Sequence, residues 1–238
     1  MNDAGDLFDQ YAAAYEESLS NALAPSGESR EYFAGGRVAW LKRCLEDRNQ
    51  PVGSILDFGC GDGATTPLLL EALNAKFGVG VDVSAKSLEI ARKRHGNEKI
   101  RYESISEFQS SEQMASRMDL AYCNGVFHHI KPDQRATALA MIHRALREAG
   151  CFSFWENNPW SLATRYVMSR CAFDRDAILL SPPEARALLG SAGFEILRTD
   201  FRFIFPRALQ AFRKIEDWVY RAPLGTQFQI LCRKVQRE

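Results

Sequence analysis

Apolar residues recur every three or four positions in the first fifty residues of the chain, which is the spacing of an amphipathic helix. The first such set predicts a helix near the N-terminus and consists of Leu7, Phe8, Tyr11 and Tyr15. The second set predicts a helix over residues 29–45 and consists of Phe33, Val38, Leu41 and Leu45. Pro25-Ser26-Gly27 separates the two, because proline and glycine interrupt helices.

The pattern changes after residue 53, where short apolar runs alternate with longer segments of helical spacing. The runs predict strands over residues 55–58, 77–81, 99–103, 118–123, 151–155, 194–205 and 227–232. The intervening segments predict helices over residues 65–76, 84–95, 106–117, 132–147, 183–192 and 207–221. We expect Ser84 to cap the second helix, Gly150 to end the fourth, and the last to pack its apolar side on the core. This alternation indicates an α/β fold with a doubly wound, mainly parallel sheet.

The composition narrows the class of protein. Hydrophobic residues make up 46% of the 238 residues, enough for one buried core, so we do not expect a disordered chain. Thirty basic and thirty acidic residues cancel, which argues against nucleic-acid binding by the whole chain. The charge is uneven, because residues 1–29 carry no Lys or Arg whereas nine basic residues follow from residue 198 onward. We interpret the acidic N-terminal region and the basic C-terminal region as two solvated faces that can attract each other. The alternative is that the basic region forms a surface for an anionic substrate, a membrane or a lipid-linked acceptor.

Six cysteines lie far apart, at positions 44, 60, 123, 151, 171 and 232, and form no Cys-x-x-Cys pair. With the four histidines outside any zinc-finger spacing, this pattern predicts reduced thiols and no metal site. The N-terminus lacks the basic start and apolar run of a signal peptide, and no run of eighteen apolar residues occurs. We therefore expect a cytoplasmic protein without a transmembrane segment.

Candidate chemistry gathers after the first predicted strand, where residues 55–63 read Ile-Leu-Asp-Phe-Gly-Cys-Gly-Asp-Gly. Glycines there let the backbone turn sharply and let a ligand approach closely. The third glycine comes one residue earlier than in the dinucleotide fingerprint, and no Lys-Ser or Lys-Thr follows, which disfavours a polyphosphate ligand. Asp57 instead favours an ammonium or hydroxyl group nearby. Asp82, about twenty residues after the glycines at the end of the next strand, is placed to bind both hydroxyls of a ribose.

Four stretches occur in the order and on the elements typical of one enzyme family: residues 55–63, 79–84, 119–130 and 145–151. By these motifs the chain resembles the class I S-adenosylmethionine-dependent methyltransferases of the small-molecule type. The resemblance extends from about Ile55 to Trp155 and implies a Rossmann-like sheet of seven strands, the last of them antiparallel.

The resemblance also suggests a division of the chain. We expect an N-terminal helical lid over residues 1–50 and a methyltransferase domain over residues 51–238. Within that domain we expect a cofactor half over residues 51–156, an acceptor-side insertion over residues 157–181, and C-terminal helices and strands over residues 182–238.

The resemblance implies S-adenosylmethionine as the cofactor and a set of residues that contact it. These residues are Tyr11, Asp57, Gly59, Cys60, Gly61, Asp82, Val83, Ser104, Ile105, Asn124 and Gly125. Val83 would pack on the adenine, and Asn124-Gly125 would line the methionine end. Ser104 stands where the family often has an aspartate near the adenine amino group. Tyr11 and Tyr15 match a helix that many members fold over the cofactor; the alternative for both is a place in the core.

Methyl transfer from a sulfonium needs a general base only when the acceptor atom carries a proton at neutral pH. The candidates are His128 and His129, just after the fourth strand at the expected rim of the pocket. Packing and hydrogen bonding are the alternative roles for this pair. Residues 156–159, Glu-Asn-Asn-Pro, form a second polar cluster at the same edge of the sheet.

The expected activity is methyl transfer from S-adenosylmethionine to a small organic acceptor by in-line displacement. Two other functions stay open. A protein that binds S-adenosylmethionine without methylating would carry the same motifs. An NAD-dependent oxidoreductase would need the third glycine one residue later and would not predict the Asn124-Gly125 loop. No zinc finger, basic arm or interleaving of aromatic and basic residues predicts a nucleic-acid partner.

Overall fold

The computed structural model describes residues 21–112, 115–171, 174 and 176–235. The N-terminal helix expected around Tyr11 and Tyr15 therefore lies outside the described residues. The helix expected over residues 29–45 is confirmed as α3 (Arg30–Glu46), and the Ser29 hydroxyl accepts a hydrogen bond from the Tyr32 N–H at its start. A short 3-10 helix, η1 (Ala24–Ser26), precedes it.

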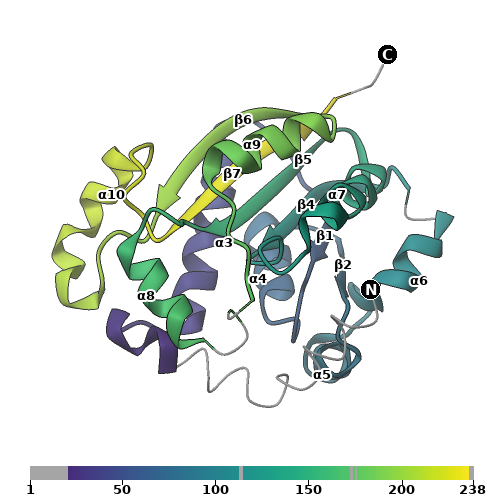
Figure 1. The fold of residues 1–238 in the computed structure, drawn as a ribbon. Coiled ribbons are helices and arrows are strands. Elements are labelled where there is room, and N and C mark those ends of the chain that lie inside the picture. The colour runs from purple at the N-terminus through teal and green to yellow at the C-terminus, as the bar shows by residue number, and fades with distance from the viewer. Residues whose placement is uncertain (1–20, 113–114, 172–173, 175, 236–238) are drawn as a thin grey trace.

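One sheet of seven strands organises the described chain (Figure 1). The strands are β1 (Ser54–Phe58), β2 (Phe77–Asp82), β3 (Ile100–Ser104), β4 (Met118–Asn124), β5 (Leu146–Asn157), β6 (Phe194–Arg202) and β7 (Gln227–Lys234). Their order across the sheet is β3-β2-β1-β4-β5-β7-β6. Strands β1 to β5 run parallel, and β7 pairs antiparallel with both β5 and β6. The predicted doubly wound, mainly parallel sheet with an antiparallel last strand is confirmed.

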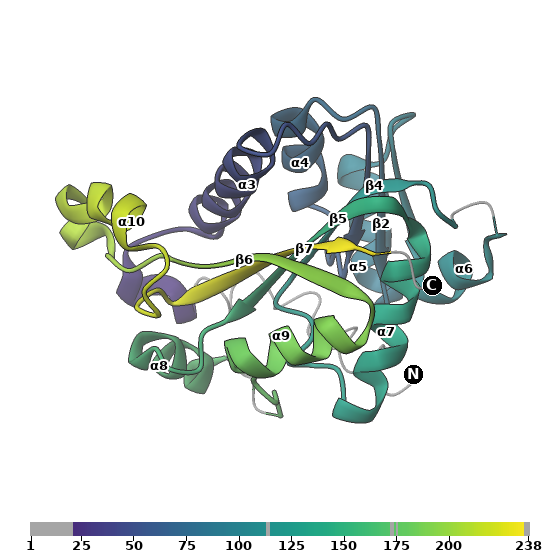
Figure 2. The ribbon, with the colours of Figure 1, turned by 90° about the horizontal axis from the view of Figure 1, so that it is seen from above.

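Helices cover both faces of this sheet, as the view from above shows (Figure 2). One face carries α3, α4 (Thr65–Leu73) and α5 (Ala85–His95); the other carries α6 (Ile105–Ser110), α7 (Pro132–Ala145) and α9 (Pro182–Ser191). The remaining helices, α8 (Leu162–Arg170), η4 (Arg207–Phe212) and α10 (Arg213–Val219), lie together at one end of the molecule in both views. In the described part of the chain, every helix is too short or too polar to cross a bilayer.

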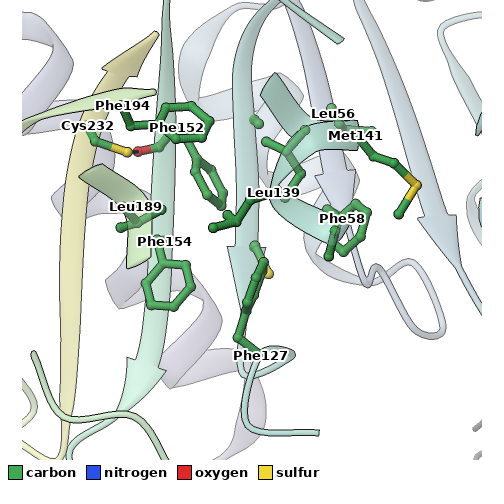
Figure 3. Packing of buried hydrophobic residues seen from close by; sticks show 14 of the residues in the cluster. Leu56, Phe58, Phe127, Leu139, Met141, Phe152, Phe154, Leu189, Phe194 and Cys232 are labelled. Atoms are coloured by element: carbon green, nitrogen blue, oxygen red, sulfur yellow. Dashed lines mark hydrogen bonds between the residues drawn. The ribbon is translucent and has the colours of Figure 1, made fainter. Parts of the chain in front are cut away.

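Two apolar layers fill the space between sheet and helices, because neighbouring residues of a strand face opposite sides. In β1, Leu56 and Phe58 pack toward α6 and α7, whereas Ile55 packs toward α3 and α4. Figure 3 shows the first of these layers, with Phe152 and Phe154 of β5 beside Leu189 of α9.

Several predicted boundaries are wrong at one end. The helix predicted over residues 132–147 ends at Ala145, because Leu146 already pairs with Met118 as the first residue of β5. Gly150 consequently lies inside that strand and does not cap the helix. The helices predicted over residues 65–76 and 106–117 end earlier, at Leu73 and Ser110, and the strand predicted over residues 194–205 ends at Arg202. Ser84 does cap α5 and accepts the Ser87 N–H.

The amphipathic helix predicted over residues 207–221 is observed as a 3-10 helix, η4, followed directly by α10, and Leu209 inside η4 departs from the helical conformation at φ −111°. The expectation that its apolar side packs on the core is wrong. Leu209, Phe212 and Ile215 are 44%, 50% and 46% exposed. The regular spacing of apolar residues predicted helical structure here, but it does not show whether another element covers the apolar side.

One contact joins the two ends of the chain that differ in charge. Glu28, the last acid of the acidic N-terminal region, pairs with Arg213 of α10 at 2.7 Å. Other basic residues of the C-terminal region pair locally, as Arg202 does with Asp217 at 2.9 Å and Arg233 with Glu195 at 2.6 Å. Part of the basic C-terminal surface is thus neutralised within the molecule.

Candidate functional site

A cavity of about 1310 Å³ opens at the carboxyl ends of β1, β2 and β4. This is where ligands of open α/β sheets bind. Its walls come from α3, the glycine loop after β1, the turn after β4, α8 and the segment after β6. A drug-sized ligand typically occupies a pocket of about 300–1,000 Å³, so this cavity has room for two small molecules.

The glycine loop forms one wall of the cavity through Gly59, Cys60 and Gly61. The N–H groups of Gly59 and Cys60 both donate to the Val81 carbonyl, at 2.8 and 3.0 Å, which ties the loop to the end of β2. Gly61 has a φ of +55°, and a Cβ on it would meet nothing within 4 Å. Its bare backbone therefore faces open space that a ligand can approach closely.

Asp82 ends β2 beside this loop and also lines the cavity. Its Oδ2 accepts the Gly61 N–H at 2.8 Å, and its Oδ1 accepts the Ser84 N–H at 2.9 Å. A carboxylate oxygen can accept more than one hydrogen bond, so the two hydroxyls of a ribose can bind there as well. The carboxylate thus holds the loop in place and keeps acceptor capacity for a ligand.

Two of the residues expected around the adenine, Val83 and Ile105, line the cavity. Ser104 is not among the lining residues. Its hydroxyl accepts the Glu107 N–H at 3.2 Å, while its own N–H donates to the Glu107 carboxylate, which forms a capping box at the start of α6. The structure therefore gives the Ser104 side chain a structural partner and does not bring it to the cavity.

Asp57 lies at the bottom of the cavity, buried, and accepts a hydrogen bond from the Thr66 hydroxyl at 2.7 Å. Burial raises the pKa of Asp57 to about 7, although the Thr66 hydrogen bond favours the ionised form. The negative charge of Asp82 acts in the same direction as burial, and the positive charge of Arg37 opposes it. A cationic group bound beside Asp57 would stabilise its carboxylate.

Arg37 of α3 is a buried cation in the wall of the cavity that our sequence analysis missed. Its guanidinium donates to the Tyr122 hydroxyl at 3.1 Å and to the Gln227 amide oxygen at 3.0 Å, both uncharged partners among the described residues. A buried guanidinium with neutral partners favours an anion from a ligand. The detectable signal was a charged residue one helical turn before Leu41, on the apolar face of the predicted helix.

The turn after β4 supplies Asn124 and Gly125, as expected. The Asn124 Oδ1 atom is buried and has no hydrogen-bond partner among the described residues. Such an acceptor is costly unless a ligand or a water binds it. With the open backbone at Gly61 and the carboxylate of Asp82, this orphaned acceptor makes the cavity fit a polar ligand with several hydrogen-bond donors.

His128 and His129 both line the cavity, on a turn that Phe127 anchors in the core. The Phe127 ring lies 5.1 Å from that of Phe154, and Figure 3 shows both rings within the cluster. His128 Nδ1 lies 2.5 Å from the Glu156 carboxylate, whose other oxygen accepts the Phe127 N–H at 2.7 Å. Glu156 therefore fixes the orientation of the His128 ring.

The two imidazoles differ in their electrostatics. Burial lowers the pKa of His128, but the carboxylates of Glu156 and Asp174 outweigh burial and raise it to about 10. Burial and the adjacent His128 lower the pKa of His129 to about 4. The Asp174 Oδ1 atom lies 3.5 Å from His128 Nε2 and 3.4 Å from His129 Nε2. Our sequence analysis missed Asp174, which no motif marks within residues 157–181.

These features define a class of protein before any comparison. The doubly wound sheet has a glycine loop after its first strand, an acid at the end of its second strand, and a cavity beside both. This arrangement is typical of nucleoside-binding α/β domains. The inserted antiparallel β7 distinguishes this sheet from a purely parallel one.

Known methyltransferases resemble this chain in sequence. Residues 55–150 match the sequence model described as a methyltransferase domain. An uncharacterised methyltransferase of Oceanobacillus iheyensis is 25% identical over 149 residues, which cover 63% of this chain and 64% of that protein. Residues 55–150 thus match a methyltransferase domain, and the chain shares its fold with S-adenosylmethionine-dependent methyltransferases.

Solved structures share the fold over nearly the whole chain. An S-adenosylmethionine-dependent methyltransferase of Thermotoga maritima has a TM-score of 0.65 at 18% identity and covers 97% of this chain and 99% of its own. A Haloferax volcanii methyltransferase, solved in complex with the Trm112 methyltransferase activator, also has a TM-score of 0.65, at 15% identity, and covers 99% of both chains. The predicted Rossmann-like methyltransferase fold is confirmed.

Proposed function

We propose that the protein transfers the methyl group of S-adenosylmethionine to a small organic acceptor by in-line displacement. The observation that carries this proposal is Asp82, which joins the glycine loop to the end of β2 and offers its carboxylate to the cavity. A ribose hydroxyl pair is the natural ligand for a carboxylate at that place in the fold.

The remaining residues fit the cofactor from end to end. Val83 and Ile105 offer apolar surface to the adenine, on the side of the cavity next to Asp82. Arg37 and Asp57 lie close enough for their charges to interact, and together they suit the carboxylate and the ammonium of an amino acid. The orphaned Asn124 Oδ1 is then an acceptor for the same ammonium group. Tyr11 stays a prediction, because it lies outside the described residues.

The acceptor would occupy the part of the cavity beyond the methionine end. That part is lined mainly by apolar and aromatic side chains from α8 and from the segment after β6: Tyr166, Val167, Met168, Phe203 and Phe205. Such a wall suits a small organic molecule more than a charged polymer. The insertion over residues 157–181 therefore supplies acceptor contacts, as proposed from the sequence.

S-adenosylmethionine, when bound, supplies a methyl group on a positively charged sulfur whose departure as a neutral sulfide needs no acid. The chain's own residues would contribute mainly position. Asp82, Arg37 and Asp57 fix the two ends of the cofactor, and the buried floor of the cavity excludes water from the space between them. Holding two reactants at near-attack distance is worth up to about 7–11 kcal/mol.

The test is to titrate the purified protein with S-adenosylmethionine, S-adenosylhomocysteine and NAD by calorimetry. We expect micromolar binding of the two adenosyl compounds and no binding of NAD. Binding of NAD alone would overturn the proposal. With candidate acceptors, S-adenosylhomocysteine must form in step with a methylated product; binding without any such product across a broad acceptor set would favour a non-methylating protein.

A second prediction concerns the pH dependence of stability at Asp57. With a folded pKa of about 7 and an ordinary value of 3.8, the folded protein holds one more proton than the unfolded chain between these pH values. The free energy of unfolding therefore falls as pH rises through this window. Asp57→Asn removes that loss. We therefore expect the free energy of unfolding of the variant, relative to that of wild type, to rise by roughly 2–3 kcal/mol between pH 5 and pH 8, as measured by urea unfolding.

Asp62 provides a control of opposite sign. Burial opposes ionisation, but the paired Arg30 guanidinium, at 2.5 Å, holds the pKa of Asp62 below its usual range. Its contribution to stability is present above the ordinary pKa and is lost in acid, so Asp62→Asn should destabilise the protein at pH 8. If both variants changed stability equally at pH 5 and pH 8, the assigned direction at Asp57 would be wrong.

A further inference from the structure

The structure brings together three metal-ligating side chains that are separated in the sequence. His128 and His129 follow β4, and Asp174 follows α8 some 45 residues later. One ligand atom from each lies within 4.8 Å of the other two, and all three residues line the cavity. Our sequence analysis predicted no metal site because it considered only ligands that are close together in the sequence. It therefore missed this group of three residues.

We propose that His128, His129 and Asp174 bind a divalent first-row transition metal ion through two imidazole nitrogens and one carboxylate oxygen. Its role beside the acceptor rests on the proposed methyl transfer, whereas the binding itself does not. Three protein ligands with one position open to a cavity is the arrangement of catalytic zinc sites. The open position would accept an oxygen, nitrogen or sulfur atom of the acceptor.

The distances favour a shared cation over direct hydrogen bonds. The Asp174 Oδ1 atom lies 3.5 Å from His128 Nε2 and 3.4 Å from His129 Nε2. Both distances exceed the usual 2.7–3.2 Å of an N–H···O hydrogen bond. Ligand atoms at about 2.0–2.2 Å from a tetrahedral ion lie about 3.3–3.5 Å from one another, which matches both.

The carboxylate of Asp174 supplies an independent sign of a missing ligand. Its side chain is only 6% exposed, and its Oδ1 atom has no hydrogen-bond partner among the described residues. A buried carboxylate oxygen without a partner is unfavourable unless a cation binds it. The atom faces the two imidazoles that would complete such a site.

The surrounding contacts hold the ligands in place. Glu156 lies 2.5 Å from His128 Nδ1, which leaves Nε2 directed at Asp174. Metal-binding histidines commonly hydrogen-bond a carboxylate in this way. The segment after Asp174 is fixed to the histidine turn, because the Ile178 N–H donates to the His128 carbonyl at 2.8 Å and Arg135 donates to the Ile178 carbonyl at 2.7 Å.

The test measures Zn²⁺ and Co²⁺ binding to the full chain without cofactor, by equilibrium dialysis and by the visible spectrum of bound Co²⁺. We expect one ion per chain and a Co²⁺ spectrum of low coordination number. His129→Ala and Asp174→Asn should each weaken binding at least about 30-fold, and Glu156→Gln about tenfold. Circular dichroism of each variant would establish that it is folded.

Two control variants separate this site from other donors. His95→Ala changes a histidine of α5 that does not line the cavity, and Cys151→Ser removes a thiol of β5 that does not line it either. Both should bind the metal as wild type does. Absence of stoichiometric metal in wild type, or equal binding by folded His129→Ala and Asp174→Asn variants, would overturn the proposal.

The outcome is separate from that of the proposed function. Wild type that binds S-adenosylmethionine but neither ion would disprove the metal site and leave methyl transfer standing. Wild type that binds the ion but not S-adenosylmethionine would support the site and refute the proposed transfer. Asp82→Ala should lose cofactor binding while it retains the metal.

Discussion

Asp82→Ala is expected to weaken the binding of S-adenosylmethionine at least about 100-fold. Hydrogen bonds to a charged group contribute about 1.5–3 kcal/mol each, and Asp82 would bind two ribose hydroxyls. The same substitution removes the acceptor of the Gly61 N–H, so it also loosens the loop along which the cofactor would lie. Asp82→Asn keeps one oxygen acceptor and should lose only about tenfold. Calorimetric titration of each variant measures the effect.

Asp119 gives a matched control for this variant. It is a carboxylate on β4 that likewise accepts two backbone N–H groups, from Gly53 and Ser54 at 2.8 and 2.9 Å. It lies at the opposite ends of the strands and does not line the cavity. Asp119→Ala should therefore reduce the free energy of unfolding and leave cofactor affinity unchanged. Equal losses of affinity in the two alanine variants would mean that Asp82 acts only through stability.

Gly63→Ala is expected to destabilise the protein by roughly 3–4 kcal/mol. Gly63 has a φ of +78°, and a Cβ there would lie 2.7 Å from the Tyr102 ring and 2.8 Å from Ala91 Cβ. A left-handed backbone costs an alanine about 1–2 kcal/mol, and overpacking of a core adds about 1–3 kcal/mol. Tyr102 cannot move freely, since its hydroxyl donates to the Gly63 carbonyl at 3.0 Å. Denaturant unfolding measures the loss.

Gly61→Ala should behave differently although it lies two residues away. Its φ is also positive, but its Cβ would meet no atom within 4 Å. We expect a stability loss of only about 1–2 kcal/mol from the backbone, together with at least a tenfold loss of cofactor affinity, because the methyl group enters the cavity. If Gly61→Ala bound the cofactor normally, the ligand would not lie against this part of the loop.

The parallel core of the fold could be predicted closely from the sequence. Strands β1, β2 and β4 begin and end within one residue of the predicted positions, because their apolar runs end sharply at glycine or at polar residues. The predicted end of α7 was wrong because β5 follows the helix without a loop between them. Ala145 is the last residue of the helix, and Leu146 is the first residue of β5. Gly150 suggested a cap, yet only the pairing of Leu146 with Met118 determines where the strand starts.

The candidate site divides in the same way. Asp82, Gly61 and Asn124 follow strands whose carboxyl ends must meet at one edge, so the sequence could bring them together. Arg37 and Asp174 reach the cavity through contacts between distant segments. Arg37 depends on the packing of α3 against the end of β7, through Gln227. Asp174 depends on the bond that joins Ile178 to His128, and no periodic pattern records such a bond.

The position of β7 between β5 and β6 has a consequence for synthesis of the chain. β6 is made before β7, yet within the described part of the chain β7 is the strand that pairs with it. Until residues 227–234 have left the ribosome, β6 has no strand to join and β5 presents an open edge. Open edges of this kind pair readily with other chains. A ribosome stalled in α10 would therefore hold a nascent chain whose β5 edge is open to pairing with other chains.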